Sequence, residues 1–348
     1  MPAHPGKANV IPGLMAAAGI ALVATTVSVL FQRLPEPLAS LPVSTILVAI
    51  LLGLALAGRA RQRPAWTPGL QLAAGPVLKL AVMLIGLRLS LGELGALGLQ
   101  AVPLVLGALL SGLVLAGLLG RAFGVGSKLT ALLAVGAAIC GASAVAATAP
   151  ALKARAEETA YALACVALFG LAATLLYPWL LNYWLLEGRQ IGLVLGAAIH
   201  DTAQVTAAAF MVEQTFGHVE VVAAATVTKL LRNLAMLIVI PVVVWWALRG
   251  EQSTGARPAF PWFIVGFVGL AALRSGGDLF WAHSAAWQAL LAAAGHASGF
   301  LFAMAMAAIG MSIHIAALRA LGARPAWVAL CTALGMGAVA LLLLRLFA

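Results

Sequence analysis

The chain has 348 residues, of which 64% are hydrophobic and only 9% are charged, whereas an ordinary soluble domain has about 25% charged residues. Its mean hydropathy is +1.08. These values exclude a soluble globular domain and indicate a membrane protein with many helices. The net charge of +10 does not indicate a nucleic-acid partner, because the basic residues are scattered over short connections, where they set membrane topology.

Eleven apolar runs follow one another along the chain, most of them long enough to cross a bilayer as a helix. They cover residues 11–30, 41–58, 70–87, 101–120, 129–149, 159–181, 191–212, 221–247, 259–273, 286–311 and 325–347. The run 259–273 is short, and the run 221–247 carries Pro241, which we expect to kink or end its helix. The sequence therefore predicts an all-α, polytopic transmembrane bundle of 10–11 spans, with residues 1–348 forming a single membrane transport domain.

The basic residues between these runs predict the orientation in the membrane. With the N-terminus inside, one side collects Lys7, Arg59, Arg61, Arg63, Arg121, Lys128, Arg189, Arg249, Arg257, Arg319 and Arg324. The other side collects only Arg33, Arg88, Lys153, Arg155, Arg274 and Arg345. Because the cytoplasmic side of a membrane protein carries the excess of Lys and Arg, we expect a cytoplasmic N-terminus. The three remaining basic residues, Lys79, Lys229 and Arg232, lie within the runs.

The first segment that suggests a function is CGASAVAATAP, residues 140–150. Small residues let helices approach closely, and Gly with Pro permits a break in the helix. The N-terminus of a half-helix is a ready site for an anion, and Ser143 and Thr148 add hydroxyl groups to it. The alternative is a tightly packed but unbroken helix.

The second segment is GAAIHDTAQVT, residues 196–206. His200 and Gln204 are four residues apart and share a helix face. At membrane depth Asp201 must be protonated, paired or bound to a cation, and a neighbouring histidine suits proton coupling. The alternative is a buried hydrogen-bonded cluster that only fixes helix packing. A metal site is not expected, because no further ligand stands at metal-binding spacing.

The third segment is TVTKLLRN, residues 226–233, in which Lys229, Arg232 and Asn233 form a polar stripe. Arginine does not lose its proton in practice, so Arg232 needs a permanent partner, for which Asp201 and an anionic substrate are the candidates. The alternative is that both cations extend to the membrane interface. Lys79, about ten residues into an earlier run, is a further candidate with the same alternative.

Two other groups of residues have simpler interpretations. Glu157 and Glu158 begin a helical run, where carboxylates commonly cap a helix N-terminus. The tryptophans near the ends of the runs fit an aromatic belt at the membrane interface: Trp179, Trp184, Trp245, Trp246 and Trp262.

Two pairs of segments are similar to each other within the chain. Residues 135–149 and 195–209 share a Gly-Ala-Ala-Ile core, and residues 84–98 and 308–322 share Ile-Gly and Ala-Leu-Gly. Internal repeats are typical of secondary transporters. The two pairs have different offsets, 60 and 224 residues, so a single tandem duplication does not explain both.

The motifs CGASAVAATAP, EETAYALACVALFG, GAAIHDTAQV and VTKLLRN occur in this order, with LKLAVMLIGLRLSL before them and AMAAIGMSIHIAALRALGARP after them. Over residues 75–325 this set resembles a family of bacterial inner-membrane proteins named for sulfate export. The resemblance implies a multi-pass inner-membrane protein, similar in architecture to inverted-repeat carriers with two crossing broken helices. It would place the family's polar motif residues at Lys79, Ser143, Glu158, His200, Asp201, Gln204, Lys229 and Arg232.

These observations together predict a secondary transporter of a small anion, such as sulfate or an organosulfonate, and not an enzyme. The expected substrate-binding residues are Lys79, Ser143, Thr148, His200, Gln204, Lys229 and Arg232. Asp201, His200 and Glu158 are expected to couple transport to a proton or a sodium ion. No cofactor and no metal is expected, and the small-residue helices would allow a homodimer. The alternatives are a cation/proton antiporter with Asp201 as its ion site, a membrane-embedded enzyme and a non-transporting receptor.

Overall fold

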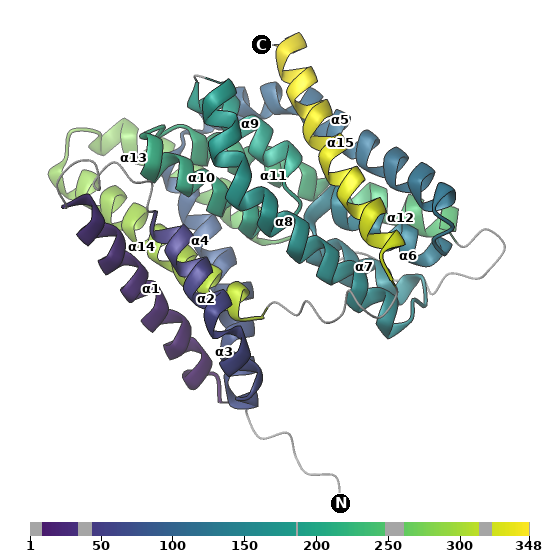
Figure 1. The fold of residues 1–348 in the computed structure, drawn as a ribbon. Coiled ribbons are helices and arrows are strands. Elements are labelled where there is room, and N and C mark those ends of the chain that lie inside the picture. The colour runs from purple at the N-terminus through teal and green to yellow at the C-terminus, as the bar shows by residue number, and fades with distance from the viewer. Residues whose placement is uncertain (1–8, 34–43, 186, 248–260, 313–321, 348) are drawn as a thin grey trace, which may run out of the picture. The chain divides into compact units, whose positions relative to one another are not determined.

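The computed structural model describes residues 9–33, 44–185, 187–247, 261–312 and 322–347. Within these ranges every regular element is a helix, as the sequence predicts (Figure 1). The described helices form two compact units, Met1–Arg88 with Gly266–Ile313, and Leu89–Val265 with His314–Ala348. The single-domain organisation predicted for residues 1–348 stays a prediction.

The first unit is built on three helices that pack on one another, α1, α2 and α14 (Figure 1). Its elements are α1 (Ile11–Gln32), α2 (Thr45–Arg61), η1 (Pro64–Trp66), α3 (Thr67–Leu72), η2 (Ala73–Val77), α4 (Leu78–Ile85), η3 (Gly86–Arg88), α13 (Phe263–Trp281) and α14 (Ala285–Ser312). The first three residues of α13 belong to the second unit.

The second unit contains the segments with the conspicuous polar residues. Its elements are α5 (Leu91–Ala122), α6 (Ser127–Val135), η4 (Gly136–Cys140), α7 (Ala142–Ala151), α8 (Ala156–Trp184), α9 (Gly188–Ala198), α10 (Thr202–Phe216), α11 (Val221–Leu234), α12 (Met236–Ala247) and α15 (Arg324–Phe347). Helix α11 lies against α5, α9 and α10, so its side chains form the centre of this unit.

Seven of the described helical stretches are long and apolar enough to cross a membrane, and the bent pair α11 and α12 would add an eighth. The seven are Ile11–Phe31, Pro64–Arg88, Leu91–Ala122, Ala156–Trp184, Phe263–Trp281, Ala285–Ser312 and Arg324–Phe347. Each of the eleven apolar runs does contain helix. The larger number of spans expected from the sequence arose because α2 has only 17 residues and because the runs 129–149 and 191–212 are each split into two helices.

The bend in the run 221–247 lies at Ala235, between α11 and α12, and measures 44°. Pro241 lies inside α12, after the bend. The prediction that Pro241 kinks or ends the helix was therefore wrong. The chain has already changed direction and begun a new helix six residues before the proline.

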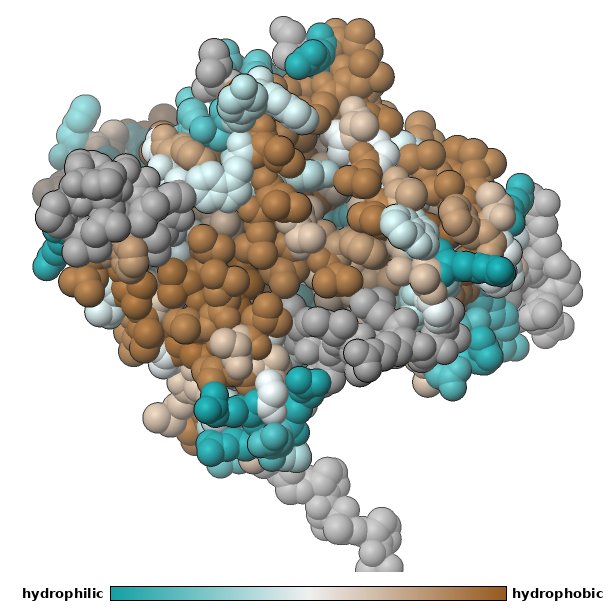
Figure 2. Space-filling model, viewed as in Figure 1, coloured by the Kyte–Doolittle hydropathy of each residue, from teal (hydrophilic) through white to brown (hydrophobic). Residues whose placement is uncertain are grey.

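The described surface is consistent with a lipid environment. Many large apolar side chains are exposed, among them Leu99, Leu110 and Ile238, which are 78%, 63% and 72% exposed. On the face drawn in Figure 2, hydrophobic residues cover most of the described surface and hydrophilic residues gather in separate patches. Exposed apolar surface on this scale is not stable in water but is matched by lipid chains.

Candidate functional site

Two helices of the second unit are broken at matching places in their sequences. Helix α6 continues through the π-helical turn η4, stops at Gly141 and restarts as α7. Helix α9 stops at Ala198 and the chain restarts as α10 at Thr202. Gly-Ala-Ala-Ile ends the first half of both helices, which explains the internal similarity of residues 135–149 and 195–209. The predicted break in the first segment is confirmed, and the alternative of an unbroken helix is wrong.

The two breaks touch each other at Gly141 and Asp201. The backbone of Gly141 has φ 64° and ψ −124°, a conformation that L side chains rarely adopt. A Cβ atom at this position would lie 3.0 Å from the Cβ of Asp201 and 2.9 Å from its Oδ2. Glycine is therefore needed here both for the turn of the chain and for the room it leaves to Asp201.

Helix α11 packs tightly against the first half of the second broken helix. A Cβ atom on Gly196 of α9 would lie 2.5 Å from the Cβ of Thr228 and 2.6 Å from the carbonyl oxygen of Ala225. Small residues thus bring the two backbones together. The close approach directs the long side chains of Lys229 and Arg232 from α11 toward the breaks.

Arg232 is completely buried, and every one of its guanidinium nitrogens donates to backbone carbonyl groups at the breaks. Nε donates to Ala138 at 3.1 Å and Nη2 to Ala137 at 2.7 Å. Nη1 has three acceptors, the carbonyl oxygens of Gly196, Ala197 and Ile199. One guanidinium group therefore joins the end of η4 to the end of α9.

Lys229 is also completely buried and makes the same kind of contact. Its Nζ donates to the carbonyl oxygens of Ile139 at 2.9 Å and Ile199 at 3.0 Å, and also to that of His200. An ammonium group has three protons to donate, so its capacity is used. The alternative that Lys229 and Arg232 extend to the membrane interface is wrong.

The physical reason for this arrangement is the polarity of a helix end. The last carbonyl groups of a helix receive no hydrogen bond from an N–H group of the same helix, and together they carry a partial negative charge. A break at membrane depth exposes two such ends where water does not reach. Lys229 and Arg232 supply the missing donors and the compensating positive charge for both ends.

Asp201 takes the opposite position, at the N-terminal ends of the second halves. Its Oδ1 accepts a hydrogen bond from the backbone N–H of Ala203 at 2.9 Å and so caps α10. Its Oδ2 lies beside the turn that precedes α7, 2.9 Å from the position of a Cβ atom on Gly141. Helix α7 has no side-chain cap from Gly141 itself. The half-buried carboxyl group therefore caps α10 and lies next to the N-terminal end of α7.

Gln204 and His200 lie beside this carboxylate and are both buried. Gln204 completes the capping box of α10, where its Oε1 accepts from the backbone N–H of Asp201 at 3.3 Å, and its Nε2 donates to Ala167 of α8 at 3.4 Å. His200 is 2% exposed, and its Nδ1 has no hydrogen-bond partner among the residues that the structure describes. A buried ring nitrogen without a partner is costly, which makes His200 a candidate for a proton or a ligand atom.

The remaining predicted residues have different surroundings. Ser143 is exposed in the first turn of α7, next to the break, whereas the buried hydroxyl of Thr148 donates to the carbonyl of Ala144 in its own helix. Glu158 accepts from the backbone N–H of Arg155 at 2.8 Å, as expected of a cap of α8. Lys79 is an exposed residue of α4 in the first unit, and the structure does not group it with the residues at the breaks.

Sequence reasoning missed two features of this site. The acceptors of Lys229 and Arg232 are backbone carbonyls, for which no side-chain pattern exists. Asn233, noted only as part of a stripe, donates from Nδ2 to Thr202 Oγ1 at 3.0 Å and so ties α11 to the start of α10. The sequence signal for this role was its spacing of four residues from Lys229, which places both side chains on the same face of α11.

The formal charges at the breaks are those of Lys229, Arg232 and Asp201, a balance of +1 with a neutral His200. The two positive charges face carbonyl groups and the negative charge faces N–H groups. No cluster of His, Cys, Asp and Glu that could hold a metal ion occurs among the residues with a described placement. Cys140, Cys165 and Cys331 are free.

Comparison with known proteins supports the membrane assignment. The family model described as Conserved hypothetical protein 698 matches residues 12–329. A UPF0324 membrane protein of Ralstonia nicotianae is 37% identical over 307 residues, which cover 82% of this chain and 80% of the relative. A UPF0324 membrane protein of Pseudomonas aeruginosa is 33% identical over 331 residues, which cover 91% and 88%. The UPF0324 inner membrane protein YeiH of Escherichia coli is 31% identical over 333 residues, which cover 92% and 89%. The chain therefore belongs to the UPF0324 family of membrane proteins.

Proposed function

We propose that this protein is a secondary transporter of a small anion, such as sulfate or an organosulfonate, in the bacterial inner membrane. Transport is coupled to a proton through Asp201 with the help of His200. The named relative YeiH is an inner membrane protein. The observation that carries the proposal is the pair of broken helices that meet at the single carboxylate of Asp201, which caps α10 and lies against Gly141 before α7.

Broken helices at membrane depth are a recurrent way to build a transport site. Their half-helix N-termini present unpaired N–H groups and a partial positive charge, which attract an anion. In this protein the Asp201 carboxylate accepts from the N-terminus of α10 and lies beside that of α7. The position thus has the chemistry of an anion site, and Ser143 adds an exposed hydroxyl group in the first turn of α7.

Coupling follows from competition for the same N–H groups. While Asp201 is ionised, its carboxylate binds the N-terminus of α10, lies beside that of α7 and repels an anion. Protonation removes the negative charge and weakens these hydrogen bonds, because a neutral acceptor binds less strongly than a charged one. An anion then takes the N–H of Ala142 and the hydroxyl of Ser143. Proton and anion therefore bind together and leave together.

The structure changes the role that we propose for Lys229 and Arg232. Their donors are engaged by the carbonyl groups of the two breaks, so direct binding of substrate would require these bonds to be exchanged. We propose that they hold the half-helices in place and keep the local electrostatic potential positive. Both effects favour an anion at the nearby N-termini.

The decisive experiment is uptake of radiolabelled sulfate or methanesulfonate into proteoliposomes that contain the full chain, with and without an imposed pH gradient. We expect gradient-driven uptake in the wild type and its loss in Asp201→Asn. Glu93→Gln is the matched control, because the exposed Glu93 carboxylate also takes part in a helix capping box, that of α5, where it accepts from the backbone N–H of Ser90. Binding of the anion without any flux would indicate a receptor and would contradict the proposal.

The second candidate is a cation/proton antiporter, which is favoured by the half-exposed position of the Asp201 carboxylate. Here Asp201 would bind sodium or a proton in turn, with Lys229 and Arg232 as resident counter-charges. Thermal stabilisation by sodium or lithium that is lost in Asp201→Asn, without any stabilisation by sulfate or a sulfonate, would favour the antiporter.

A further inference from the structure

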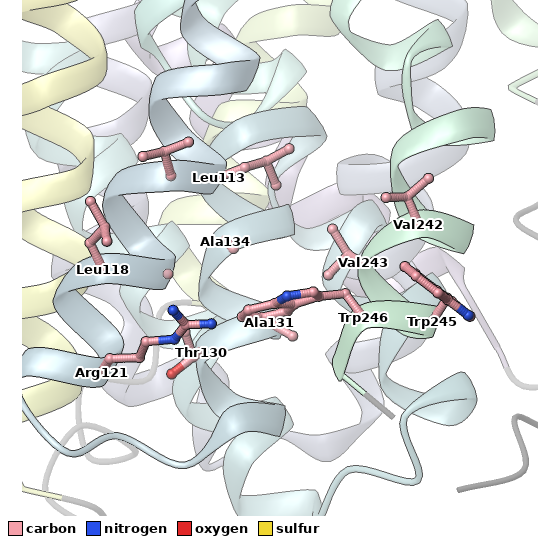
Figure 3. Close-up of a pocket in the computed structure, with 12 residues that line it drawn as sticks. Leu113, Leu118, Arg121, Thr130, Ala131, Ala134, Val242, Val243, Trp245 and Trp246 are labelled. Atoms are coloured by element: carbon pink, nitrogen blue, oxygen red, sulfur yellow. The ribbon is translucent and has the colours of Figure 1, made fainter. Parts of the chain in front are cut away.

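A groove of about 370 Å³ lies in the second unit between the end of α5, the middle of α6 and the end of α12. It is separate in sequence from the breaks and from every residue assigned to transport. Its walls are almost entirely apolar, with Leu113, Leu118, Ala131, Val242 and Val243 among them (Figure 3). Val242 and Leu118 are 56% and 57% exposed, so the groove opens onto the surface that faces lipid.

Among the described residues that line the groove, the one charged residue is Arg121, in the last turn of α5. In Figure 3 its guanidinium group points toward the ring of Trp246, and the guanidinium carbon lies 5.3 Å from the ring centroid. Arg121 forms no ion pair with another residue of the described ranges. The groove therefore combines an apolar wall with one positive charge at an aromatic edge.

The occupant that fits this combination is an amphiphile with an apolar chain and a negative head. Tryptophan and arginine at the end of membrane helices mark the level of the lipid headgroups. This level is marked here by Trp245 and Trp246 at the end of α12 and by Arg121 at the end of α5. The apolar residues line the part of the groove that lies deeper, next to the lipid chains. Basic pockets between transmembrane helices bind acidic lipid headgroups for the same reason.

We propose that this groove binds one acidic phospholipid, with an acyl chain against α5, α6 and α12 and the headgroup phosphate on Arg121. The lipid bridges α12, which follows the bend at Ala235, to the hairpin formed by α5 and α6. The bound lipid comes from the leaflet of the membrane in which Arg121 lies. The proposal is independent of the transported substrate.

The test uses the full chain in detergent micelles and follows its melting temperature as lipid is added. The lipids are dioleoylphosphatidylglycerol, which is acidic, and dioleoylphosphatidylcholine, which has the same chains and no net charge. We expect the acidic lipid to raise the melting temperature at a concentration at least about tenfold lower than the neutral lipid needs. A tenfold difference in affinity corresponds to about 1.4 kcal/mol of binding free energy. Arg121→Gln should remove this preference.

A second variant tests the groove without touching the charge. Gly117 lines the groove, and a Cβ atom there meets nothing within 4 Å, so a side chain can begin at this position, and Gly117→Leu is designed to fill the groove. We expect Gly117→Leu to lose the stabilisation by both lipids. Gly95→Leu is the matched control, because Gly95 is in the same helix, is equally free of neighbours and does not line the groove.

Three outcomes would overturn the proposal. Equal stabilisation by both lipids in the wild type would mean that the groove takes any amphiphile. A preference for the acidic lipid that persists in both Arg121→Gln and Gly117→Leu would place the lipid elsewhere. Stabilisation by inorganic phosphate alone, equal to that by phosphatidylglycerol, would identify a free anion rather than a lipid.

Discussion

The two breaks have the same local sequence before them but different residues at the turn itself. Gly-Ala-Ala-Ile is followed by Cys140 and Gly141 in one break and by His200 and Asp201 in the other. Gly141 contributes no side chain and leaves room, whereas Asp201 fills this room and caps α10. The difference concentrates the negative charge of the site on one carboxylate, which a single protonation can neutralise.

The C-terminal ends of the two first half-helices have the same binding partners, whereas the N-terminal ends of the two second half-helices differ. Lys229 and Arg232 each bind carbonyl groups of both breaks. These cations are fully buried, while Asp201 is half-exposed. We therefore expect the cations to matter most for folding and Asp201 to matter most for transport.

The largest effect on stability is expected from Arg232→Ala. Of its five carbonyl acceptors only that of Ile199 keeps a second donor, Lys229. Unsatisfied buried groups cost about 1–3 kcal/mol each, so the total loss from the other four should exceed about 3 kcal/mol. The yield of monodisperse protein and its melting temperature measure this loss.

The matched control is Arg189→Ala. Arg189 is 48% exposed and lies 3.7 Å from Glu220 in a surface ion pair, which contributes about 0–1 kcal/mol. If Arg232→Ala melts at the same temperature as Arg189→Ala, the buried arginine does not hold the breaks together.

A smaller effect is expected from Gly141→Ala. The new side chain must adopt φ 64° and ψ −124° and displace Asp201, a strain of about 1–3 kcal/mol. Gly217→Ala is the control, because Gly217 has φ 79° but no neighbour within 4 Å of its Cβ position. Thermal denaturation should show a lower melting temperature for Gly141→Ala, and the reverse order would mean that the two breaks do not touch.

The hydrogen bond between Asn233 and Thr202 secures only the second break, and a double-mutant cycle measures it. Asn233→Ala and Thr202→Val should each lower the stability, with a coupling energy of about 0.5–1.5 kcal/mol between them. Additive effects of the two substitutions would show that this bond contributes nothing to the attachment of α11 to α10.

The smallest effect on stability is expected from Asp201→Asn. Asparagine caps a helix about as well as aspartate, so the change should stay within about 1 kcal/mol. It removes the titratable carboxyl group, however, and transport should lose its dependence on the pH gradient. A large fall in melting temperature would indicate that the charge of Asp201 is structural.

The sequence alone determined the class of the protein and the segments of the site. Composition and the length of the apolar runs were enough for an all-helical membrane protein, because lipid admits few other solutions. Gly141, Asp201, Lys229 and Arg232 were recognisable as unusual because glycine permits a break and because charged groups are costly in a membrane.

Only the tertiary structure decided what these residues contact. The sequence suggested Asp201 or a substrate as the partner of Arg232, but the partners are backbone carbonyl groups, which every residue has and no sequence pattern distinguishes. The sequence also could not show that Lys79 is exposed in the first unit whereas Lys229 is buried in the second. Nor could the sequence show where a span is interrupted, since a helix that breaks and restarts is as apolar as one that continues. Helix breaks depend on groups brought from a distant helix, and that proximity exists only in the folded chain.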